Sequence, residues 1–318
     1  MHIQAEHMDE IQRRVLQHIV ERGHRVQPRG TWVQEITCAS FQLLHPRARL
    51  IYSPSRKYSI TFALGELLWY LRGSNNADII SFYNARHRAF SDDDITLHGA
   101  YGTRLFSPAL TGVVQWDAVL SLLRADRDTR QAVLHLHLPS DLLALSRDIP
   151  CTCSMQFLLR RNMLECLVVM RSNDVIWGMP YDVFSFTMLQ EIMAKQLGVE
   201  VGTYTHVIGS FHLYDRHKAL AARILDEIPA LGPAMPELPE HPWQGIRELL
   251  ETEEQLRLFG CAATWPTHPY WLELARIVEG HVAWRSKNEL HLDRVLQTLC
   301  PQYATLLRQQ VQRTSLIA

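Results

Sequence analysis

The chain has 318 residues, 47% of them hydrophobic, and a formal net charge of −1. This near-neutral balance argues against a broad electrostatic surface for nucleic acid, and no apolar run reaches the ~20 residues that cross a bilayer. The polar start, residues 1–6, does not resemble a signal peptide, so we expect a cytoplasmic protein without a membrane partner. The 6 cysteines lie apart except for Cys151 and Cys153, which is typical of reduced thiols. No paired Cys or His motif predicts a metal site.

The first part of the chain predicts a mixed α/β core. Residues 8–22 place apolar side chains at helical spacing, and residues 31–37 are rich in the β-branched and aromatic types of a strand. Residues 60–72 predict an apolar helix that ends at Gly73. Further strands are predicted over 131–138, 156–161, 164–170 and 204–209, and a further helix over 183–197.

The composition changes after about residue 228. Five prolines between 229 and 242 predict an extended linker over residues 227–242. Beyond it, residues 243–260, 268–285 and 290–313 predict helices. We therefore expect a catalytic core over residues 1–226, the linker, and a helical C-terminal appendage over residues 243–318.

Three segments carry residue types suited to chemistry on a nucleotide. Pro150-Cys151, followed by Gln156-Phe157, offers a thiol nucleophile. The segment Arg171-Ser-Asn-Asp-Val-Ile-Trp-Gly-Met-Pro-Tyr-Asp182 comes next, and His212-Leu-Tyr214 follows it. In this order, the segments resemble the nucleophile region, the nucleotide-binding signature and the sugar-binding element of the thymidylate synthases.

Weaker matches extend the resemblance to roughly residues 10–217. Glu66-Leu-Leu-Trp69 is similar to the family's ELLW helix, Tyr101-Gly102 to its YG element and Asp128-Thr-Arg130 to its phosphate motif. The resemblance implies an α/β (α+β) fold in which helices pack on a mixed sheet. It also implies a homodimer in which Arg130 reaches the neighbouring active site. The implied ligands are a pyrimidine nucleoside monophosphate and 5,10-methylenetetrahydrofolate, with no metal.

The nucleophile is the cysteine of the first segment, Cys151. A thiolate that adds to C6 of a pyrimidine makes C5 able to attack a one-carbon electrophile, which is covalent catalysis. A free thiol with a pKa of about 8.5 is only slightly ionised at neutral pH, and a nearby cation lowers that pKa. Arg171 is the candidate cation, and by the resemblance it also holds the phosphate. Cys153 points to the other face of an extended strand, so we expect it to be structural.

The resemblance assigns further roles by position. Glu66 and Tyr101 would take part in proton transfers at the base. His212 and Tyr214, two apart on a strand, would share one face and bind the ribose. The remaining candidates for substrate binding are Arg171, Ser172, Arg130, Gln156, Ser210 and one or both of Arg25 and Arg29, between which the spacing does not choose. The candidates for folate binding are Asp174, Gly178 and Trp69.

Asp182 stands where the family normally has Asn. An Asn amide matches the O4 acceptor and N3–H donor of uracil, whereas a carboxylate is an acceptor only and suits the C4 amine of cytosine. The family's closing C-terminal segment, which would exclude water, is not recognisable either. Both departures resemble the cytidylate and deoxycytidylate 5-hydroxymethyltransferase branch, so we expect water capture and a 5-hydroxymethyl product on CMP or dCMP.

Three alternatives stay open. A cytidylate methyltransferase would use the same residues. A uridylate methyltransferase would require Asp182 to be protonated, with activity that falls at high pH. A catalytically dead nucleotide-binding scaffold would present residues 243–313 to a partner, although the intact Cys151, Arg171 and Tyr101 argue against it.

Overall fold

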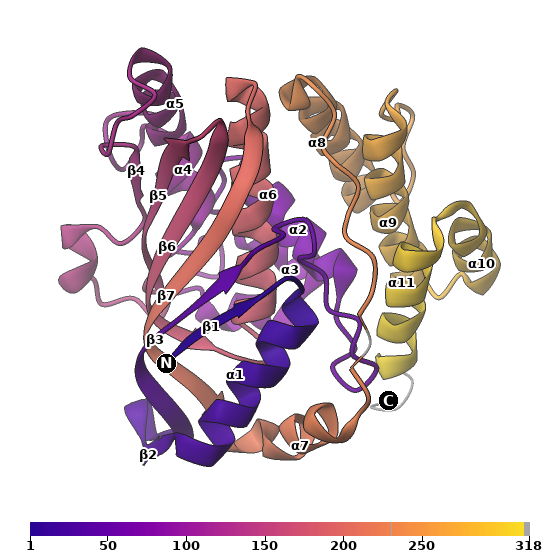
Figure 1. Ribbon diagram of the computed structural model, residues 1–318. Helices are drawn as coiled ribbons and strands as arrows, with labels where there is room; N and C mark the ends of the chain where they lie inside the picture. Colours follow the sequence, from indigo (N-terminus) through magenta and orange to yellow (C-terminus); the bar gives the residue numbers. More distant parts are fainter. Residues whose placement is uncertain (230, 315–318) are drawn as a thin grey trace.

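The computed structural model describes residues 1–229 and 231–314, which form one mixed sheet and several layers of helices (Figure 1). The strands are β1 His2–Ala5, β2 His24–Val26, β3 Val33–Leu43, β4 Val133–His135, β5 Thr152–Arg160, β6 Met163–Asp174 and β7 Glu200–Tyr214. The α-helices are α1 Met8–Arg22, α2 Ile60–Leu71, α3 Ala77–Tyr83, α4 Tyr101–Phe106, α5 Gln115–Ala125, α6 Met179–Leu197, α7 Lys218–Asp226, α8 Pro242–Phe259, α9 Pro269–Arg285, α10 Glu289–Thr298 and α11 Pro301–Thr314.

The sheet has the strand order β1-β3-β7-β6-β5-β4, with β2 paired to the outer part of β3. The pairs β1–β3 and β6–β7 are parallel, and the other pairs are antiparallel. Along β6 and β7, buried side chains alternate with partly exposed ones over most of each strand, as expected where one face meets the helices. The fold class expected from the sequence is therefore confirmed.

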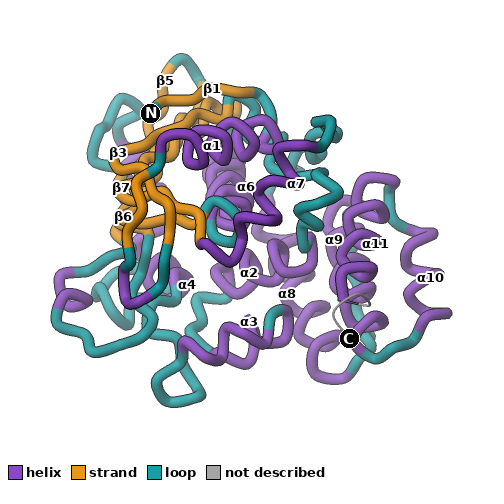
Figure 2. Tube along the Cα trace, turned by 90° about the horizontal axis from the view of Figure 1, so that it is seen from below, coloured by secondary structure: helices purple, strands orange, loops and turns teal. Residues whose placement is uncertain are grey.

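The helix α6 is the crossover between the parallel strands β6 and β7, and it is buried almost all round. A helix that is apolar on every side requires cover on every side. The sheet covers one side, and α2 and the C-terminal helices lie on the other (Figure 2). The helix starts at Met179, four residues before the predicted start, because Pro180 in its first turn needs no hydrogen-bond partner for its nitrogen.

Residues 231–241 contain no helix or strand, and they are attached closely to the core. Met235 and Leu238 are buried, and the backbone N–H of Met235 donates to the carbonyl of Arg47 at 2.8 Å. The Tyr52 hydroxyl donates to the carbonyl of Pro233 at 2.9 Å. A Cβ at Gly232 would lie 2.1 Å from the Tyr52 ring, so only glycine permits this approach. The segment is thus packed against the core along its length.

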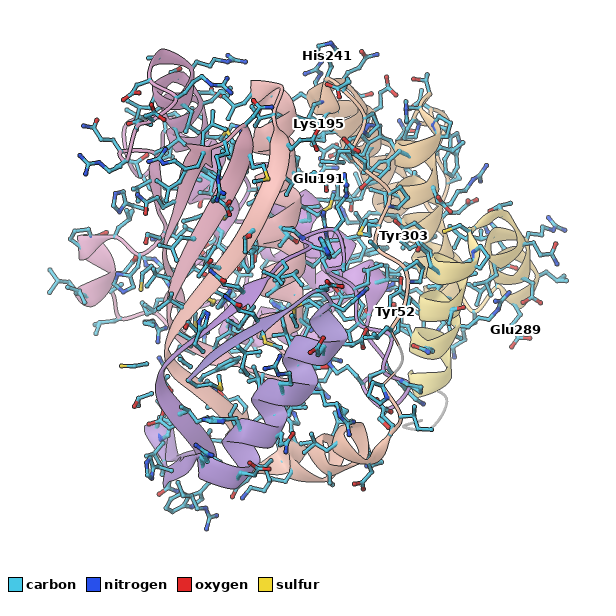
Figure 3. All side chains as sticks on the ribbon, in the orientation of Figure 1. Tyr52, Glu191, Lys195, His241, Glu289 and Tyr303 are labelled. Carbon is cyan, nitrogen blue, oxygen red and sulfur yellow. The ribbon has the colours of Figure 1, made fainter. Side chains whose placement is uncertain are left out.

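Glu191 of α6, which forms a buried ion pair with Arg49, also holds this segment. Arg49 Nη2 lies 2.5 Å from Glu191 Oε2, and both side chains are 0% exposed. The other oxygen, Glu191 Oε1, accepts the backbone N–H of Leu238 at 3.0 Å. One turn further along α6, Lys195 pairs with Glu237 at 2.5 Å and with Glu240 at 2.8 Å. Figure 3 shows Glu191 and Lys195 beside residues 231–241.

The C-terminal helices cover the side of α2 that faces away from the sheet. Thr61 on α2 lies 3.1 Å from His281 Nδ1 of α9 and accepts from Gln310 Nε2 of α11 at 2.7 Å. At the other end of α2, Arg72 pairs with Glu253 of α8 at 2.6 Å. None of the helices in residues 1–229 and 231–314 is both long and apolar enough to cross a membrane.

We expect Glu191→Gln to lower the free energy of unfolding by about 3–5 kcal/mol, because it leaves the Arg49 charge buried without a counter-charge. Chemical denaturation followed by circular dichroism measures the change. Glu240→Gln is the matched control: this side chain is 69% exposed, and losing its ion pair with Lys195 should change the free energy by about 0–1 kcal/mol. Equal effects of the two substitutions would contradict a central role for the buried pair.

Candidate active site

A cavity of about 900 Å³ opens between α2, α4 and the ends of β6 and β7. Most of the residues predicted from the sequence line it, although they come from distant parts of the chain. They are Arg29, Glu66, Trp69, Tyr101, Cys151, Arg171, Ser172, Asp174, Gly178, Asp182, Ser210, His212 and Tyr214.

Three predicted residues lie outside this cavity. Arg25 forms an ion pair with Asp215 at 2.7 Å and stacks over Trp32. Its guanidinium therefore interacts with surface residues outside the cavity. Gln156 Nε2 donates to the carbonyl of Arg130 at 2.9 Å, and the Arg130 side chain is exposed. Within one chain, the arginine next to the site from the loop before β3 is therefore Arg29, which lies in a left-handed turn with a φ of 50°.

Arg171 is fixed beside Cys151 by backbone carbonyls. Its backbone N–H donates to the Cys151 carbonyl at 2.9 Å. Its guanidinium donates from Nε to Pro150 and from Nη2 to Ile149, both at 2.9 Å. These contacts leave Nη1 available for a ligand in the cavity, and they place a permanent positive charge next to the thiol.

The pKa of the Cys151 thiol is nevertheless raised. Burial raises this pKa, and Arg171 lowers it as expected from the sequence, with a further contribution from Arg29. The carboxylates of Asp182 and Asp148 act in the raising direction. Arg171 thus has the expected effect on the thiol but does not outweigh burial, and at neutral pH the cysteine of the free protein is mainly a thiol.

Tyr101 is oriented by Thr152, the residue after Cys151. The Tyr101 hydroxyl accepts from the Thr152 backbone N–H at 3.1 Å and from the Thr152 hydroxyl at 2.9 Å. Burial raises the pKa of Tyr101 well above its usual value, as do the nearby Asp182 and Cys151. The hydroxyl therefore keeps its proton, and because Thr152 occupies its acceptor side, that proton is free to meet a ligand.

Glu66 and Asp182 are two acidic groups in one buried region. Burial raises the pKa of Glu66 well above its usual value, and so does the charge of Asp182. The oxygen Oε2 of Glu66 is buried and has no hydrogen-bond partner among the described residues. Burial also raises the pKa of Asp182 to about 7, with the Asn173 amide lowering it and Asp174 raising it. At neutral pH, Glu66 is an acid that can donate a proton, and Asp182 is roughly half ionised.

Asp174 and Ser210 already have partners within the chain. The carboxylate of Asp174 accepts the backbone N–H groups of Ile176 at 2.9 Å and Trp177 at 3.3 Å, and so closes the turn between β6 and α6. The Ser210 hydroxyl donates to the carboxylate of Glu35, a cavity residue that the sequence did not single out. Glu35 reaches this place because β3 and β7 pair with Glu35 opposite His212.

His212 and Tyr214 lie in the cavity on the same face of β7, as predicted. Their rings meet edge to face with centroids 5.0 Å apart. Other lining residues that the sequence did not single out include Tyr70, Asp148 and Asn173. Asn173 lies inside the Arg171–Asp182 motif, so its position in the chain was a signal, whereas Tyr70 and Asp148 become part of the site only through the packing of α2 and the loop before β5.

Two buried polar atoms beside the cavity, one of them on the folate candidate Trp69, could meet a ligand. Trp69 Nε1 and Glu66 Oε2 are buried, line the cavity and have no hydrogen-bond partner among residues 1–229 and 231–314. A volume of about 900 Å³ lies at the upper end of small-molecule sites, so it has space for a nucleotide and a second ligand. In the same described ranges, no three His, Cys, Asp or Glu side chains are grouped as metal ligands would be.

Comparison with known proteins finds relatives over part of the chain. A Bacillus phage SP01 protein named deoxyuridylate hydroxymethyltransferase is 31% identical over 215 residues, which cover 63% of this chain and 55% of the relative. A Pseudomonas phage M6 protein of the same name is 34% identical over 175 residues, 54% of this chain and 49% of the relative. The chain thus spans about half the length of the curated relatives it matches. The profile described as thymidylate synthase matches residues 10–242, and the chain belongs to the thymidylate synthase family.

Proposed function

We propose that the protein transfers a one-carbon unit from 5,10-methylenetetrahydrofolate to C5 of a cytosine nucleotide, CMP or dCMP, and that water completes the reaction to give the 5-hydroxymethyl nucleotide. The observation that carries this proposal is Asp182, a carboxyl group at the base-reading position of a cavity that also contains Cys151. The names of the two phage relatives support the hydroxymethyl outcome.

In this proposal, the nucleotide is held at both ends. The free Nη1 of Arg171, together with Arg29, would bind the phosphate, for which the planar guanidinium is suited. His212 and Tyr214 would contact the ribose from β7. The folate, which supplies the electrophilic one-carbon unit, would lie against Trp69, Gly178 and Asp174, which line the cavity.

The side chains around the base would then move protons and stabilise charge. When the Cys151 sulfur bonds to C6, negative charge develops toward the C4 edge of the ring. The protonated Glu66 can donate to that edge as the charge develops, because burial keeps its proton in place. The fixed O–H of Tyr101 can orient the water that receives the C5 proton.

The choice of base depends on the protonation of Asp182. Neutral Asp182 can donate to N3 of cytosine and accept from the C4 amine, and ionised Asp182 can still accept from the amine. Uracil offers an acceptor at O4 and a donor at N3, so only neutral Asp182 can make both hydrogen bonds to it, whereas ionised Asp182 can accept from N3–H but places an acceptor against O4. Because the pKa of Asp182 is about 7, and because both relatives are named for deoxyuridylate, uracil nucleotides are the second candidate substrate.

A methyl product, from a cytidylate or a uridylate nucleotide, would require hydride delivery in a site that excludes water. The end of the chain, residues 315–318, where the family's closing segment would be sought, lies outside the described residues. A scaffold without catalysis is the remaining alternative. Product analysis separates these candidates.

Incubation with methylenetetrahydrofolate and CMP, dCMP, UMP or dUMP in turn, followed by mass spectrometry, should show a gain of CH2O on a cytosine nucleotide. Cys151→Ser should reduce turnover at least about 10³-fold while the nucleotide still binds, because it removes the nucleophile alone. A gain of CH2 would move the final step to hydride transfer. No product from any nucleotide would favour the scaffold.

Asp182→Asn should invert the base preference, with a change of about 10²-fold or more in the uracil-to-cytosine ratio of kcat/KM, because an amide matches O4 and N3–H of uracil. In the unmodified protein, this ratio should fall above pH 7, because ionised Asp182 keeps its hydrogen bond to the C4 amine of cytosine but faces the O4 acceptor of uracil. Taking the ratio cancels the ionisation of Cys151. A preference unchanged by Asp182→Asn would show that Asp182 does not read the base.

The expected homodimer has a complementation test. No α-helix of the described residues covers the sheet face opposite α6 in Figure 2, and a second copy would bring its own Arg130 across that face. Arg130→Ala and Cys151→Ser chains, each weak or inactive alone, should recover about a quarter of full activity when refolded together, because half of the dimers then contain one complete site. No recovery would mean that Arg130 does not serve the partner's site.

A further inference from the structure

The part of the cavity formed by β3 and β7 contains a carboxylate that the proposed reaction does not use. Glu35 is the residue of β3 that lines the cavity, and Ser210, His212 and Tyr214 line it from β7. The antiparallel register of the two strands places Glu35 directly opposite His212. Directly opposite side chains lie on the same face of a sheet, with Cβ atoms about 4.5–5.5 Å apart. Glu35 is therefore the cross-strand neighbour of His212 in the cavity.

One oxygen of this carboxylate is held by the chain itself. The Ser210 hydroxyl donates to Glu35 Oε2. Among residues 1–229 and 231–314, the Glu35 side chain forms this hydrogen bond and no ion pair, and Arg25 of the adjacent strand β2 pairs with Asp215 instead. The single hydroxyl proton of Ser210 is thus used to orient the carboxylate. Because a carboxylate accepts and does not donate, Oε1 is available to a ligand group that donates.

The neighbouring side chains indicate that this donor is a sugar hydroxyl. In the proposed function, His212 and Tyr214 contact the ribose, and two such side chains can satisfy the 3′-hydroxyl that CMP and dCMP share. The 2′-hydroxyl is next to it on the ring, is present in CMP alone, and brings one further proton to donate. A carboxylate binds a ribose 2′-hydroxyl in this way in dinucleotide-binding folds.

We propose that Glu35, oriented by Ser210, is a specificity-determining residue that accepts a hydrogen bond from the 2′-hydroxyl of a ribonucleotide, so that the protein prefers CMP to dCMP. The inference rests on the proposed function for the position of the ribose beside His212. It does not require turnover, because it concerns binding. The two phage relatives are named for a deoxyribonucleotide, so the sugar is a point on which this chain would differ from them.

Isothermal titration calorimetry of the full chain with nucleotides, in the absence of folate, measures this preference directly. CMP should bind about tenfold or more tightly than dCMP, because a hydrogen bond to a charged group is gained. The sharper probe is 2′-deoxy-2′-fluoro-CMP, since its fluorine cannot donate a proton, and it should bind like dCMP. A 2′-fluoro nucleotide that binds like CMP would show selection by shape and would overturn the inference.

Glu35→Leu removes both oxygens at similar size and should bring the CMP-to-dCMP affinity ratio to about one, through weaker binding of CMP alone. Glu35→Gln keeps a neutral acceptor and should lower the ratio about threefold or more, since charge-assisted hydrogen bonds are roughly twice as strong as neutral ones. Ser210→Ala, which removes the group that orients the carboxylate, should lower the ratio by less than Glu35→Leu does. Glu200→Gln is the matched control: Glu200 is exposed at the start of β7, and the ratio should stay unchanged.

The outcomes separate this inference from the proposed function. A CMP preference that Glu35→Leu abolishes, in a protein without transferase activity, would support the reading of the sugar by Glu35 and reject the proposed function. Transferase activity as proposed, with dCMP bound as tightly as CMP or more tightly, would overturn the inference alone. A protein that binds neither nucleotide would contradict both.

The variants can also overturn the inference by themselves. A CMP preference that persists in folded Glu35→Leu would show that another group reads the 2′-hydroxyl. An equal loss of CMP and dCMP binding would show that Glu35 acts on a group that both nucleotides share, such as the 3′-hydroxyl. If Glu35→Leu does not fold, Glu35→Gln decides.

Discussion

The arrangement of the molecule depends on one constraint: α6 is a helix buried on nearly every side that still carries polar groups at both ends. Its first turn carries Asp182 into the cavity, and its later turns carry Glu191 to Arg49 and to the backbone of Leu238. Gln190, also fully buried, donates to the carbonyl of Leu164 at 2.8 Å and so ties the helix to the sheet. Glu191 and the Gln190 amide nitrogen are permitted in the interior because a specific partner meets each of them, whereas Gln190 Oε1 has no partner among the described residues.

The acidic groups of the site are buried, and burial raises the pKa values of Glu66, Asp182, Tyr101 and Cys151. Arg171, held by the carbonyls of Ile149 and Pro150, is the fixed cation beside Cys151. Glu66, Tyr101 and Cys151 therefore remain protonated at neutral pH. This suits a reaction in which negative charge appears on the base only after the nucleophile has added, because the acids respond to the charge when it forms.

Much of this architecture could be predicted from local patterns. Apolar spacing predicted the helices over residues 8–22 and 60–72. Short motifs resembling those of a known family predicted that Cys151, Arg171, His212 and Tyr214 lie in one cavity. What could not be predicted depends on contacts between distant segments. Arg25 forms an ion pair with Asp215, and the Ser210 hydroxyl donates to Glu35. Neither partner can be inferred without the register of β2, β3 and β7. The attachment of residues 231–241 likewise depends on the shape of Tyr52 and on Glu191.

The pairing of Tyr101 with Thr152 has a consequence for how this site would respond to acidity. A histidine at position 152 would gain or lose a charge between about pH 5 and 8, and the orientation of the phenol would change with it. The threonine hydroxyl and backbone N–H have no charge to gain or lose in that range, so the phenol keeps one orientation from mildly acidic to mildly alkaline solution. The geometry around Tyr101 thereby stays constant while the nearby Asp182 carboxyl group, with a pKa of about 7, gains or loses its proton.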